Sequence, residues 1–314
     1  MSHGESGAIG FVGIGSMGWP MAAALVKAGF QVAVADAVAG RADYFAETVG
    51  GRAALDAADA ASGASFIVTM LSTSQHVADV VRQNLDAFPP DSLIIDMSSG
   101  VPQITQDLAG EVNSKGISLV DCPVSGGVPR AQTGDLSIMA GGSSQNLDRA
   151  MPLLMTMGSA VQRCGDVGAG QAMKALNNLA SAGGFLIGVE ALLIGKAYGL
   201  EPSLMVDVLN SSSGMNNSTK QKFKQYVLSR SFDSGFGLDL MVKDLGIAID
   251  VARDCRAVTP LATLCHQLWA AAANHLGPGL DQTDMARFSE DLSGVTLAED
   301  SVVEEQLFGD PAGS

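Results

Sequence analysis

The stretch Ile9-Gly10-Phe11-Val12-Gly13-Ile14-Gly15-Ser16-Met17-Gly18 runs from an apolar segment into a Gly-x-Gly-x-x-Gly motif, and a helix-forming segment follows it. In such a strand, turn and helix unit the first glycine permits a tight turn. The second lets the backbone approach a pyrophosphate, and the third allows close packing of the helix on the strand. The first N–H groups of the helix face the anion. The stretch therefore predicts a dinucleotide-binding site, formed by Gly13, Ile14, Gly15, Ser16, Met17 and Gly18.

A second apolar run, Gln31–Asp36, ends in an acidic residue 18 positions after Gly18. A carboxylate near this spacing accepts hydrogen bonds from the ribose hydroxyls of an adenosine. It would repel a 2′-phosphate, so Asp36 predicts NAD as the cofactor. Arg41, five positions on, is able to turn toward a phosphate, which leaves NADP as the alternative.

Length, composition and charge limit the kind of protein that this sequence encodes. The 314 residues are 47% hydrophobic and only 16% charged, enough to bury substantial cores in two domains. A net charge of −15 argues against nucleic acid and anionic membranes as partners. The four cysteines show no CxxC spacing and no neighbouring histidine, so we expect reduced thiols and no metal site. The polar N-terminus has no cleavable-signal pattern, which favours a cytoplasmic location.

The first half of the chain alternates β-rich runs with helical patterns, which is typical of a parallel sheet covered by helices on both faces. We expect an α/β Rossmann domain here. The expected strands are Ile9–Val12, Gln31–Asp36, Phe66–Met70, Leu93–Asp96, Ser118–Asp121, Leu136–Ala140 and Ala160–Arg163, and the expected helices Met17–Ala28, Ser74–Leu85, Val101–Asn113 and Ser144–Met155.

Three glycines, Gly165, Gly168 and Gly170, interrupt this pattern, and nothing after them reads as a strand. We therefore expect a dinucleotide-binding domain over residues 1–166, an all-helical domain over 167–298 and a flexible acidic tail over 299–314. The helices expected in the second domain are Gln171–Gly199, Pro202–Asn210, Thr219–Val227, Leu240–Arg253 and Leu261–Leu276.

The segment Gln171–Gly199 is apolar around most of its circumference. It holds Glu190 and repeated glycines, so a buried core helix explains it better than a membrane span. Such a helix needs cover on most sides, and we expect part of that cover to come from a second subunit. The expected assembly is a homodimer or a homotetramer.

Lys174 opens this apolar helix, and Asn178 follows one turn later on the same face. Burial and the positive helix N-terminus both disfavour an ammonium, so we expect a lysine suited to proton transfer. The alternative is a lysine that extends from a helix end into solvent. The dinucleotide motif favours the catalytic interpretation.

The segment Asp121–Gly127 follows an apolar strand and offers the Ser125 hydroxyl and the N–H groups of Gly126 and Gly127. These donors suit a carboxylate, although a plain turn is the alternative. His76 lies just beyond an expected strand, where it is placed to line the cofactor cleft. The pair Lys243-Asp244 reads, from the residues alone, as a solvated charge pair.

Taken together, four segments resemble the signatures of the β-hydroxyacid dehydrogenase family. They are the glycine motif with Trp19-Pro20-Met21, Asp96–Ser99, Asp121–Gly127 and Gly170–Asn178. The resemblance covers roughly residues 8 to 295. It implies a Rossmann domain followed by a helical domain, joined by a long helix as in 6-phosphogluconate dehydrogenase. It also implies reversible oxidation of a short 3-hydroxy acid, such as 3-hydroxyisobutyrate, with reduction of 2-hydroxy-3-oxopropionate as the alternative.

The same resemblance implies roles for single residues. Lys174 would be the catalytic acid and base. Substrate would be bound by Ser125, Gly126, Gly127 and Asn178, the nicotinamide would be bordered by Leu71 and Ser99, and Lys243 would close over cofactor and substrate.

Two departures from the family pattern leave the substrate open. Ser72 stands where the family usually has proline, and Pro129-Arg130 resembles the reductase branch. An imine reductase and a non-catalytic dinucleotide-binding protein are further alternatives, and the presence of Lys174 counts against both.

Overall fold

The computed structural model describes residues 7–298, so the expected acidic tail lies outside the described residues. The chain divides into two compact units, Met1–Ala175 and Leu176–Ser314. This division falls inside a helix, later than the boundary at residue 166 that the glycines indicated. The start of that helix is hydrogen-bonded to the N-terminal unit through Asp121, as described below.

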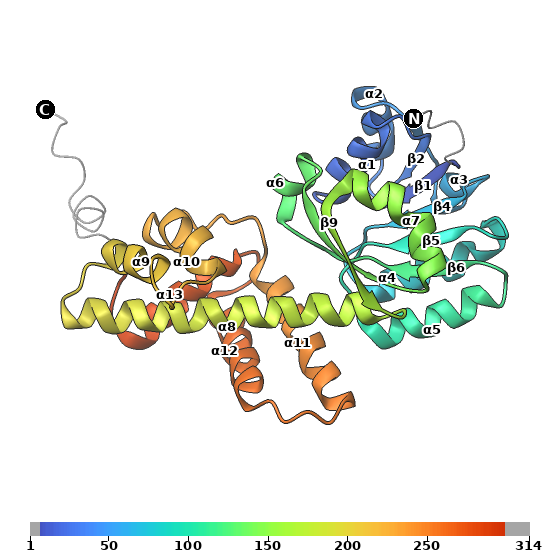
Figure 1. The fold of residues 1–314 in the computed structure, drawn as a ribbon. Helices are drawn as coiled ribbons and strands as arrows, with labels where there is room; N and C mark the ends of the chain where they lie inside the picture. The colour runs from blue at the N-terminus through green and yellow to red at the C-terminus, as the bar shows by residue number, and fades with distance from the viewer. Residues whose placement is uncertain (1–6, 299–314) are drawn as a thin grey trace, which may run out of the picture. The chain divides into compact units, whose positions relative to one another are not determined.

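The N-terminal unit is built on one sheet in the order β3-β2-β1-β4-β5-β6-β8-β7, with β9 paired to β8 (Figure 1). Its strands are β1 (Ile9–Val12), β2 (Val32–Ala35), β3 (Arg52–Ala53), β4 (Phe66–Thr69), β5 (Leu93–Asp96), β6 (Ser118–Asp121), β7 (Val124–Ser125), β8 (Leu136–Gly141) and β9 (Gly158–Gly165). The seven expected strands are all present. The short strands β3 and β7 were not predicted.

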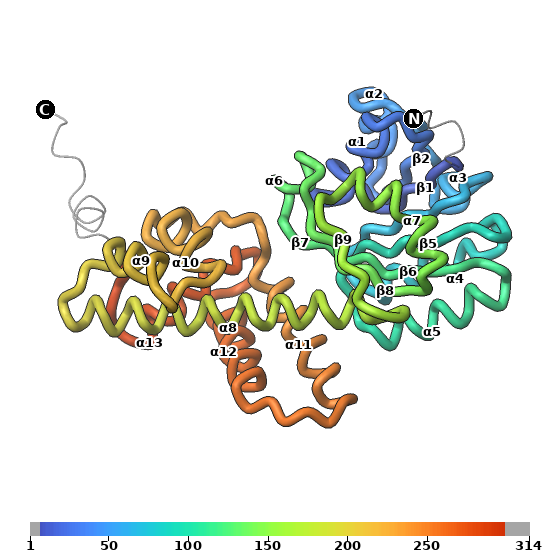
Figure 2. Tube along the Cα trace, viewed as in Figure 1, coloured from blue at the N-terminus to red at the C-terminus, as the bar shows by residue number. Residues whose placement is uncertain are grey.

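The predicted parallel sheet is confirmed, and it carries an antiparallel strand at one edge. Strands β1 to β6 are parallel, whereas β8 is antiparallel to β6 and β7. Only the short helix α6 (Gly127–Gln132) and its flanking turns separate β7 from β8, and a parallel crossover needs a dozen or more residues. Strand β9 then runs parallel to β8 along its length (Figure 2).

Helices cover both faces of this sheet, because its strands send alternate side chains to opposite sides. Val68 and Ile95 belong to the core shared with α1 (Gly18–Lys27), α2 (Arg41–Thr48) and α7 (Ser144–Met157). Their neighbours Ile67 and Ile94 face the core shared with α3 (Ala57–Ala61), α4 (Ser74–Asn84) and α5 (Pro102–Asn113). A 3-10 turn, η1 (Leu85–Ala87), follows α4. Both faces of the sheet are therefore buried under helices.

The C-terminal unit is helical within the described residues, apart from one isolated bridge between Gly237 and Asp281. The helix α8 (Ala169–Tyr198) leads into it. The remaining elements are α9 (Pro202–Asn210), α10 (Asn217–Gln221), the π-helix η2 (Phe223–Leu228), α11 (Leu238–Asp254), α12 (Pro260–Leu276), the 3-10 turn η3 (Gln282–Asp284) and α13 (Met285–Ser293).

The expected helix Thr219–Val227 is divided at Lys222. The Asn216 side chain caps α10 by accepting from the amides of Ser218 and Thr219. At Lys222 the backbone leaves helical geometry, and the π-helix η2 begins. The Phe223 ring packs against Gly188 of α8, where a Cβ atom would lie 2.6 Å from it. The glycine in α8 thus provides the space that an aromatic residue of η2 fills.

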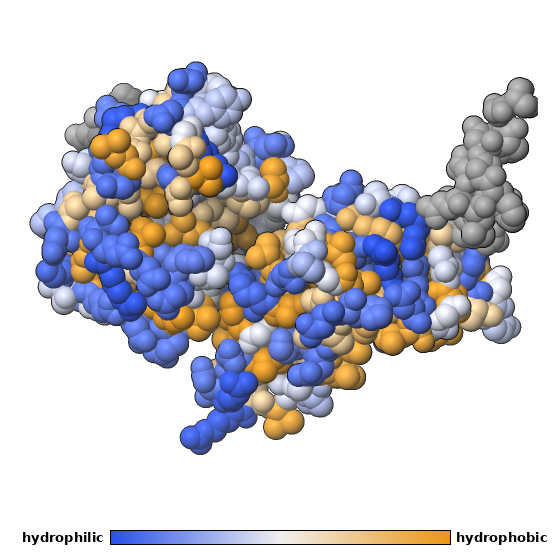
Figure 3. Space-filling view, turned by 180° about the vertical axis from the view of Figure 1, so that it is seen from behind, coloured by the Kyte–Doolittle hydropathy of each residue, from blue (hydrophilic) through white to orange (hydrophobic). Residues whose placement is uncertain are grey.

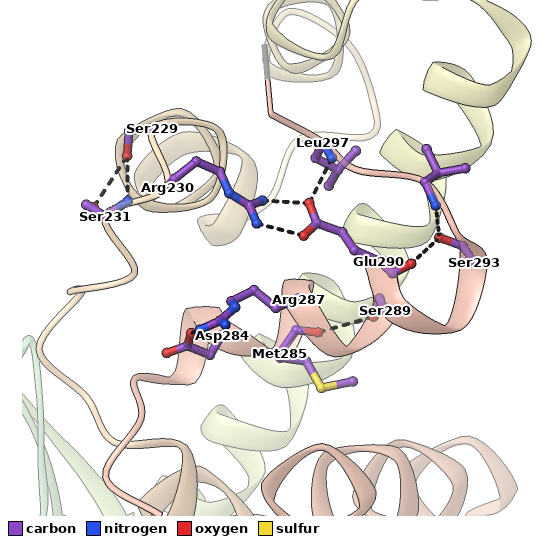
Figure 4. Close-up of polar contacts among 11 residues, drawn as sticks. Ser229, Arg230, Ser231, Asp284, Met285, Arg287, Ser289, Glu290, Ser293 and Leu297 are labelled. Atoms are coloured by element: carbon purple, nitrogen blue, oxygen red, sulfur yellow. Dashed lines mark hydrogen bonds and ion pairs between the residues drawn. The ribbon is translucent and has the colours of Figure 1, made fainter. Parts of the chain in front are cut away.

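A partly buried ion pair joins two segments of this unit (Figure 4). Arg230 donates to both carboxylate oxygens of Glu290, at 2.6 and 2.9 Å, and Glu290 also accepts from the Leu297 amide at 2.8 Å. Glu290 is only 7% exposed. The pair fastens α13 and the segment after it to the segment that follows η2.

Helix α8 is, among the described residues, the one long and apolar enough to cross a membrane, and half of its most apolar window is buried in the protein. Its buried side includes Phe185, Val189 and Leu192, which belong to the core of the C-terminal unit. Its other side leaves Ile187 and Ile194 more than half exposed. Apolar side chains also reach the surface elsewhere in this unit (Figure 3).

Candidate active site

The glycine turn after β1 has the geometry that its motif requires. Gly13 has a positive φ of 94°, and a Cβ on it would lie 2.4 Å from the Met70 carbonyl oxygen. A Cβ on Gly18 would lie 2.0 Å from the Gly13 carbonyl oxygen, so only glycine lets α1 pack this closely on β1. Gly15 is different, because a Cβ there would meet nothing within 4 Å. The side of the turn at Gly15 is therefore open.

The same turn carries hydrogen-bond donors that other described residues do not use. Within residues 7–298, the amides of Gly15, Ser16 and Met17 donate to no other group. They lie at the start of α1, where the helix dipole favours an anion. An open turn with unused amides fits the pyrophosphate of a dinucleotide. Gly13, Ile14, Gly15, Ser16, Met17 and Gly18 are the residues that would hold it.

Asp36 lies directly after β2, beside this turn. Its Oδ2 accepts from the Ile14 amide at 2.9 Å, and its Oδ1 accepts from the Val38 amide at 2.8 Å and from Arg41 Nη1 at 2.9 Å. The Asp36 carboxylate is 7% exposed and the Arg41 side chain 35%. Asp36 therefore holds the glycine turn in place and anchors Arg41.

The ends of β4 and β5 are joined by a buried carboxylate. Asp96 accepts from Thr69 Oγ1 at 2.9 Å and from the Ser98 amide at 3.0 Å, while Ser98 Oγ accepts from the Leu71 amide at 2.9 Å. Burial raises the pKa of Asp96 to about 6, although the hydrogen bonds from Ser98 and Thr69 act in the opposite direction. The network fixes the loops that carry Leu71 and Ser99.

A second buried carboxylate fixes the start of α8. Asp121, at the end of β6, accepts from the amides of Gly168 and Gln171 at 2.7 and 2.8 Å. Burial raises the pKa of this carboxyl, and the amide hydrogen bonds counteract the rise. The side chain of Gln171 then accepts from the Gly100 amide at 2.7 Å and donates to the Ser98 carbonyl oxygen at 2.9 Å.

Lys174 lies one turn after Gln171 and is 8% exposed. Because Asp121 and Gln171 fasten this part of α8, the lysine is carried on backbone that is tied to the carboxyl ends of β5 and β6. In doubly wound sheets ligands bind at that edge. The lysine expected to move a proton is thus held rigidly in the N-terminal unit.

Ser125 ends β7, and the two glycines after it form a sharp turn into α6, with φ of 134° at Gly126 and 66° at Gly127. Neither glycine amide donates to another of the residues described between positions 7 and 298. Ser125 and both glycines are partly exposed. The donors expected for a carboxylate are therefore available.

Asn178 and the Lys243-Asp244 pair meet in the C-terminal unit. Asn178 Nδ2 donates to Asp244 Oδ2 at 2.6 Å, and Lys243 Nζ lies 3.3 Å from Asp244 Oδ1. Asp244 is 1% exposed, so the interpretation of this pair as solvated is wrong. Its carboxylate is buried against α8, where it orients Asn178 and holds Lys243.

His76 and Ser99 are the remaining candidates for the border of the cofactor site. His76 lies exposed in the first turn of α4, and its amide donates to Thr73 Oγ1 at 3.1 Å. Ser99 is partly exposed between Ser98 and Gly100. Among residues 7–298 no group of three or more His, Cys, Asp or Glu side chains is placed to hold a metal ion.

Comparisons with known proteins agree with this arrangement. A family model described as the NAD binding domain of 6-phosphogluconate dehydrogenase matches residues 8–165, and one described as NAD-binding of NADP-dependent 3-hydroxyisobutyrate dehydrogenase matches residues 168–289. The 3-hydroxyisobutyrate dehydrogenase of Pseudomonas aeruginosa is 37% identical, over 87% of this chain and 95% of that protein. The chain belongs to the β-hydroxyacid dehydrogenase family. Family membership makes it an NAD(P)-dependent oxidoreductase of 3-hydroxy acids.

Two further members of the β-hydroxyacid dehydrogenase family are similar over most of their length. The 2-(hydroxymethyl)glutarate dehydrogenase of Eubacterium barkeri is 32% identical, over 92% of this chain and 97% of that protein. The structure of Mycobacterium tuberculosis 3-hydroxyisobutyrate dehydrogenase with L-serine has a TM-score of 0.83 at 32% identity, covering 90% and 98% of the two chains. An imine reductase from Myxococcus stipitatus, at 17% identity and a TM-score of 0.61, shares the fold alone.

Sequence reasoning missed the supporting residues of this dehydrogenase site. Asp96, Asp121 and Gln171 touch neither the glycine turn nor an exposed surface, yet they fix the loops and the helix that carry the site. A signal was present, since both aspartates end apolar runs that were predicted as strands. A charged residue at the carboxyl end of a buried strand needs partners from a neighbouring loop.

Proposed function

We propose that this chain catalyses the reversible oxidation of a short 3-hydroxy acid to its semialdehyde, with NAD preferred over NADP. The similarity to 2-(hydroxymethyl)glutarate dehydrogenase and to 3-hydroxyisobutyrate dehydrogenase supports a 3-hydroxy acid substrate. The observation that carries the proposal is the buried Lys174, held at the carboxyl ends of β5 and β6 by Asp121 and Gln171. Asp36 beside the glycine turn supports the preference for NAD.

The mechanism assigns each polar residue a task. The Ser125 hydroxyl and the amides of Gly126 and Gly127 bind the substrate carboxylate. Lys174 takes the proton from the substrate hydroxyl, and in the reverse direction its ammonium donates that proton to the carbonyl oxygen. The nicotinamide, when bound, supplies the hydride acceptor. A proton transfer of this kind accelerates a reaction by about 10²–10⁴-fold.

Asn178 lies four residues after Lys174, on the same face of α8. Because its Nδ2 donates to Asp244, its orientation is fixed before substrate arrives. We assign Asn178 to the substrate and Lys243 to the cofactor. Leu71, His76 and Ser99 are assigned to the border of the cofactor site.

The proposal is tested by Lys174→Ala, with Lys115→Ala as the control. The Lys115 side chain is 54% exposed and pairs with Asp86, so its loss should change neither folding nor activity. We expect the Lys174 variant to lose at least 10²-fold in kcat for NADH formation from 3-hydroxyisobutyrate, while NADH binding, followed by fluorescence, stays within threefold. Near wild-type turnover in Lys174→Ala would exclude this lysine as the acid and base.

A second candidate within the family is a reductase of 2-hydroxy-3-oxopropionate. The pair Pro129-Arg130 favours it, and Arg130 lies in the first turns after the proposed carboxylate-binding loop. Steady-state kinetics on 3-hydroxyisobutyrate, 3-hydroxypropionate, glycerate and L-serine, in both directions, separate the two. A cyclic imine in the same panel tests imine reduction.

We also propose that the chain assembles into a homodimer or a homotetramer in the cytoplasm. On α8 the exposed residues Met173, Leu176, Ile187 and Ile194 are separated by about one, three and two turns of helix, so they form an apolar stripe. Light scattering of the wild type and of Ile187→Asp tests the assembly. A monomeric wild type would contradict it, and cell fractionation tests the location.

A further inference from the structure

Lys222 is a buried cation for which the proposed chemistry so far has no use. It lies between α10 and the π-helix η2 and is 9% exposed. Its Nζ donates to Gln282 Oε1 at 3.0 Å and lies 3.5 Å from Ser181 Oγ and 5.8 Å from the centre of the Phe185 ring. Across residues 7–298 no carboxylate lies within ion-pair distance of Nζ. Neutral partners alone compensate an ammonium poorly.

Asp281 is the carboxylate that interacts with Lys222 through space, and its oxygens already accept hydrogen bonds from other groups. Asp281 favours the charged lysine by a through-space interaction. Its oxygens accept from Ser234 Oγ, from the amides of Gly235 and Phe236, and from Thr283. Asp281 therefore organises the loop before η3. Among the described residues, the Lys222 ammonium donates to neutral acceptors and to no carboxylate.

The contact between Lys222 and Ser181 of α8 relates this lysine to the proposed site. Its neighbour Ser181 follows Asn178 by three residues and Lys174 by seven, so the three share one face of the helix. At a rise of about 1.5 Å per residue, roughly 10 Å of helix separates Lys174 from Ser181. A hydroxy acid of four to six carbons, with a contact of about 3 Å at each end, has a length of this order.

We propose that Lys222 determines specificity by binding a second carboxylate, at the end of the substrate remote from the reacting hydroxyl. This inference rests on the proposed function and names its substrate class, the 3-hydroxy dicarboxylic acids. Ser181 and Gln282 position the ammonium, and the Phe185 ring lies 5.8 Å from Nζ. A π-helical turn adjoins the residue, and such turns recur at functional sites.

The test compares two substrates in two variants. We expect the wild type to favour 2-(hydroxymethyl)glutarate over 3-hydroxyisobutyrate in kcat/KM. In Lys222→Met, kcat/KM for the dicarboxylate should fall by about 10- to 100-fold, mainly through KM, the size expected for a hydrogen bond to a charged group. The value for the monocarboxylate should stay within threefold. Lys224→Met is the control, because Lys224 lies two positions on and pairs with Asp207 at the surface.

An equal fall for both substrates would assign Lys222 a structural role and overturn the inference, as would no fall at all. If the wild type oxidises neither substrate, the proposed function fails, and calorimetry with glutarate decides the inference separately. We then expect the wild type to bind glutarate at least tenfold more tightly than butyrate, and Lys222→Met to lose that difference. Equal binding of the two acids by the wild type would overturn the inference.

Discussion

Replacing Lys222 by methionine should stabilise the protein at neutral pH. Burial lowers the pKa of Lys222 from 10.5 to about 8. At about 1.4 kcal/mol per pH unit, keeping this lysine charged in the folded state costs about 3 kcal/mol. Methionine removes that cost, but leaves Gln282 Oε1 without its donor, which costs about 1 kcal/mol. The net expected gain is about 2 kcal/mol.

The sign of the pH dependence follows from the two pKa values. Below pH 8 the lysine is charged in both the folded and the unfolded state, and the wild type bears the whole cost. Between pH 8 and 10.5 the unfolded state binds more protons, so the stability of the wild type rises with pH. The advantage of Lys222→Met should therefore be largest at pH 7 and shrink toward pH 10.

The assay is thermal unfolding of the wild type, Lys222→Met and the control Lys224→Met, at pH values from 7 to 9.5. At pH 7 we expect the Lys222 variant to melt about 5 °C above the wild type. Lys224 lies at the surface in an ion pair, so its loss should change stability by at most about 1 kcal/mol at every pH. A Lys222 variant that is less stable than the wild type, or a difference independent of pH, would refute the reasoning.

Two further predictions concern the cofactor site. Gly15→Ala should fold like the wild type, because its new methyl group enters open space. It should bind NADH at least tenfold more weakly, because that open space is where the pyrophosphate would approach the turn. Gly18→Ala should unfold at a lower temperature, because its Cβ meets the Gly13 carbonyl oxygen. Fluorescence titration and thermal melts separate the two, and weak folding of Gly15→Ala would contradict the assignment. Asp36→Ala should raise the KM for NAD more than the KM for NADP, and an unchanged ratio would argue against its role at the ribose.

The strands show how much of the sheet could be predicted from local sequence. Ile9–Val12, Leu93–Asp96 and Ser118–Asp121 were predicted with their observed bounds, because short apolar runs buried on both faces leave little freedom of assignment. The antiparallel edge was not predicted. There, strand direction depends on the length of the link between β7 and β8, and β7 itself is too short to give a signal.

The site residues divide in a similar way. The glycine turn and Lys174 were predicted as site residues because each has a local signature. The role of Asp244 was not evident from its own neighbours, since its partner Asn178 lies 66 positions earlier in the chain. A charged pair on a helix is solvated unless another element covers it.

The sequence by itself determined the alternation of strands and helices, and it located the glycine turn and the lysine that we propose as the acid and base, because these depend on neighbours within a few turns. The tertiary structure alone decided which charges are buried. No local pattern predicts that Asp96, Asp121, Asp244 and Lys222 are buried, and burial gives them their partners and, for three of them, a shifted pKa. Burial results from packing between segments distant in the chain, which no local pattern contains.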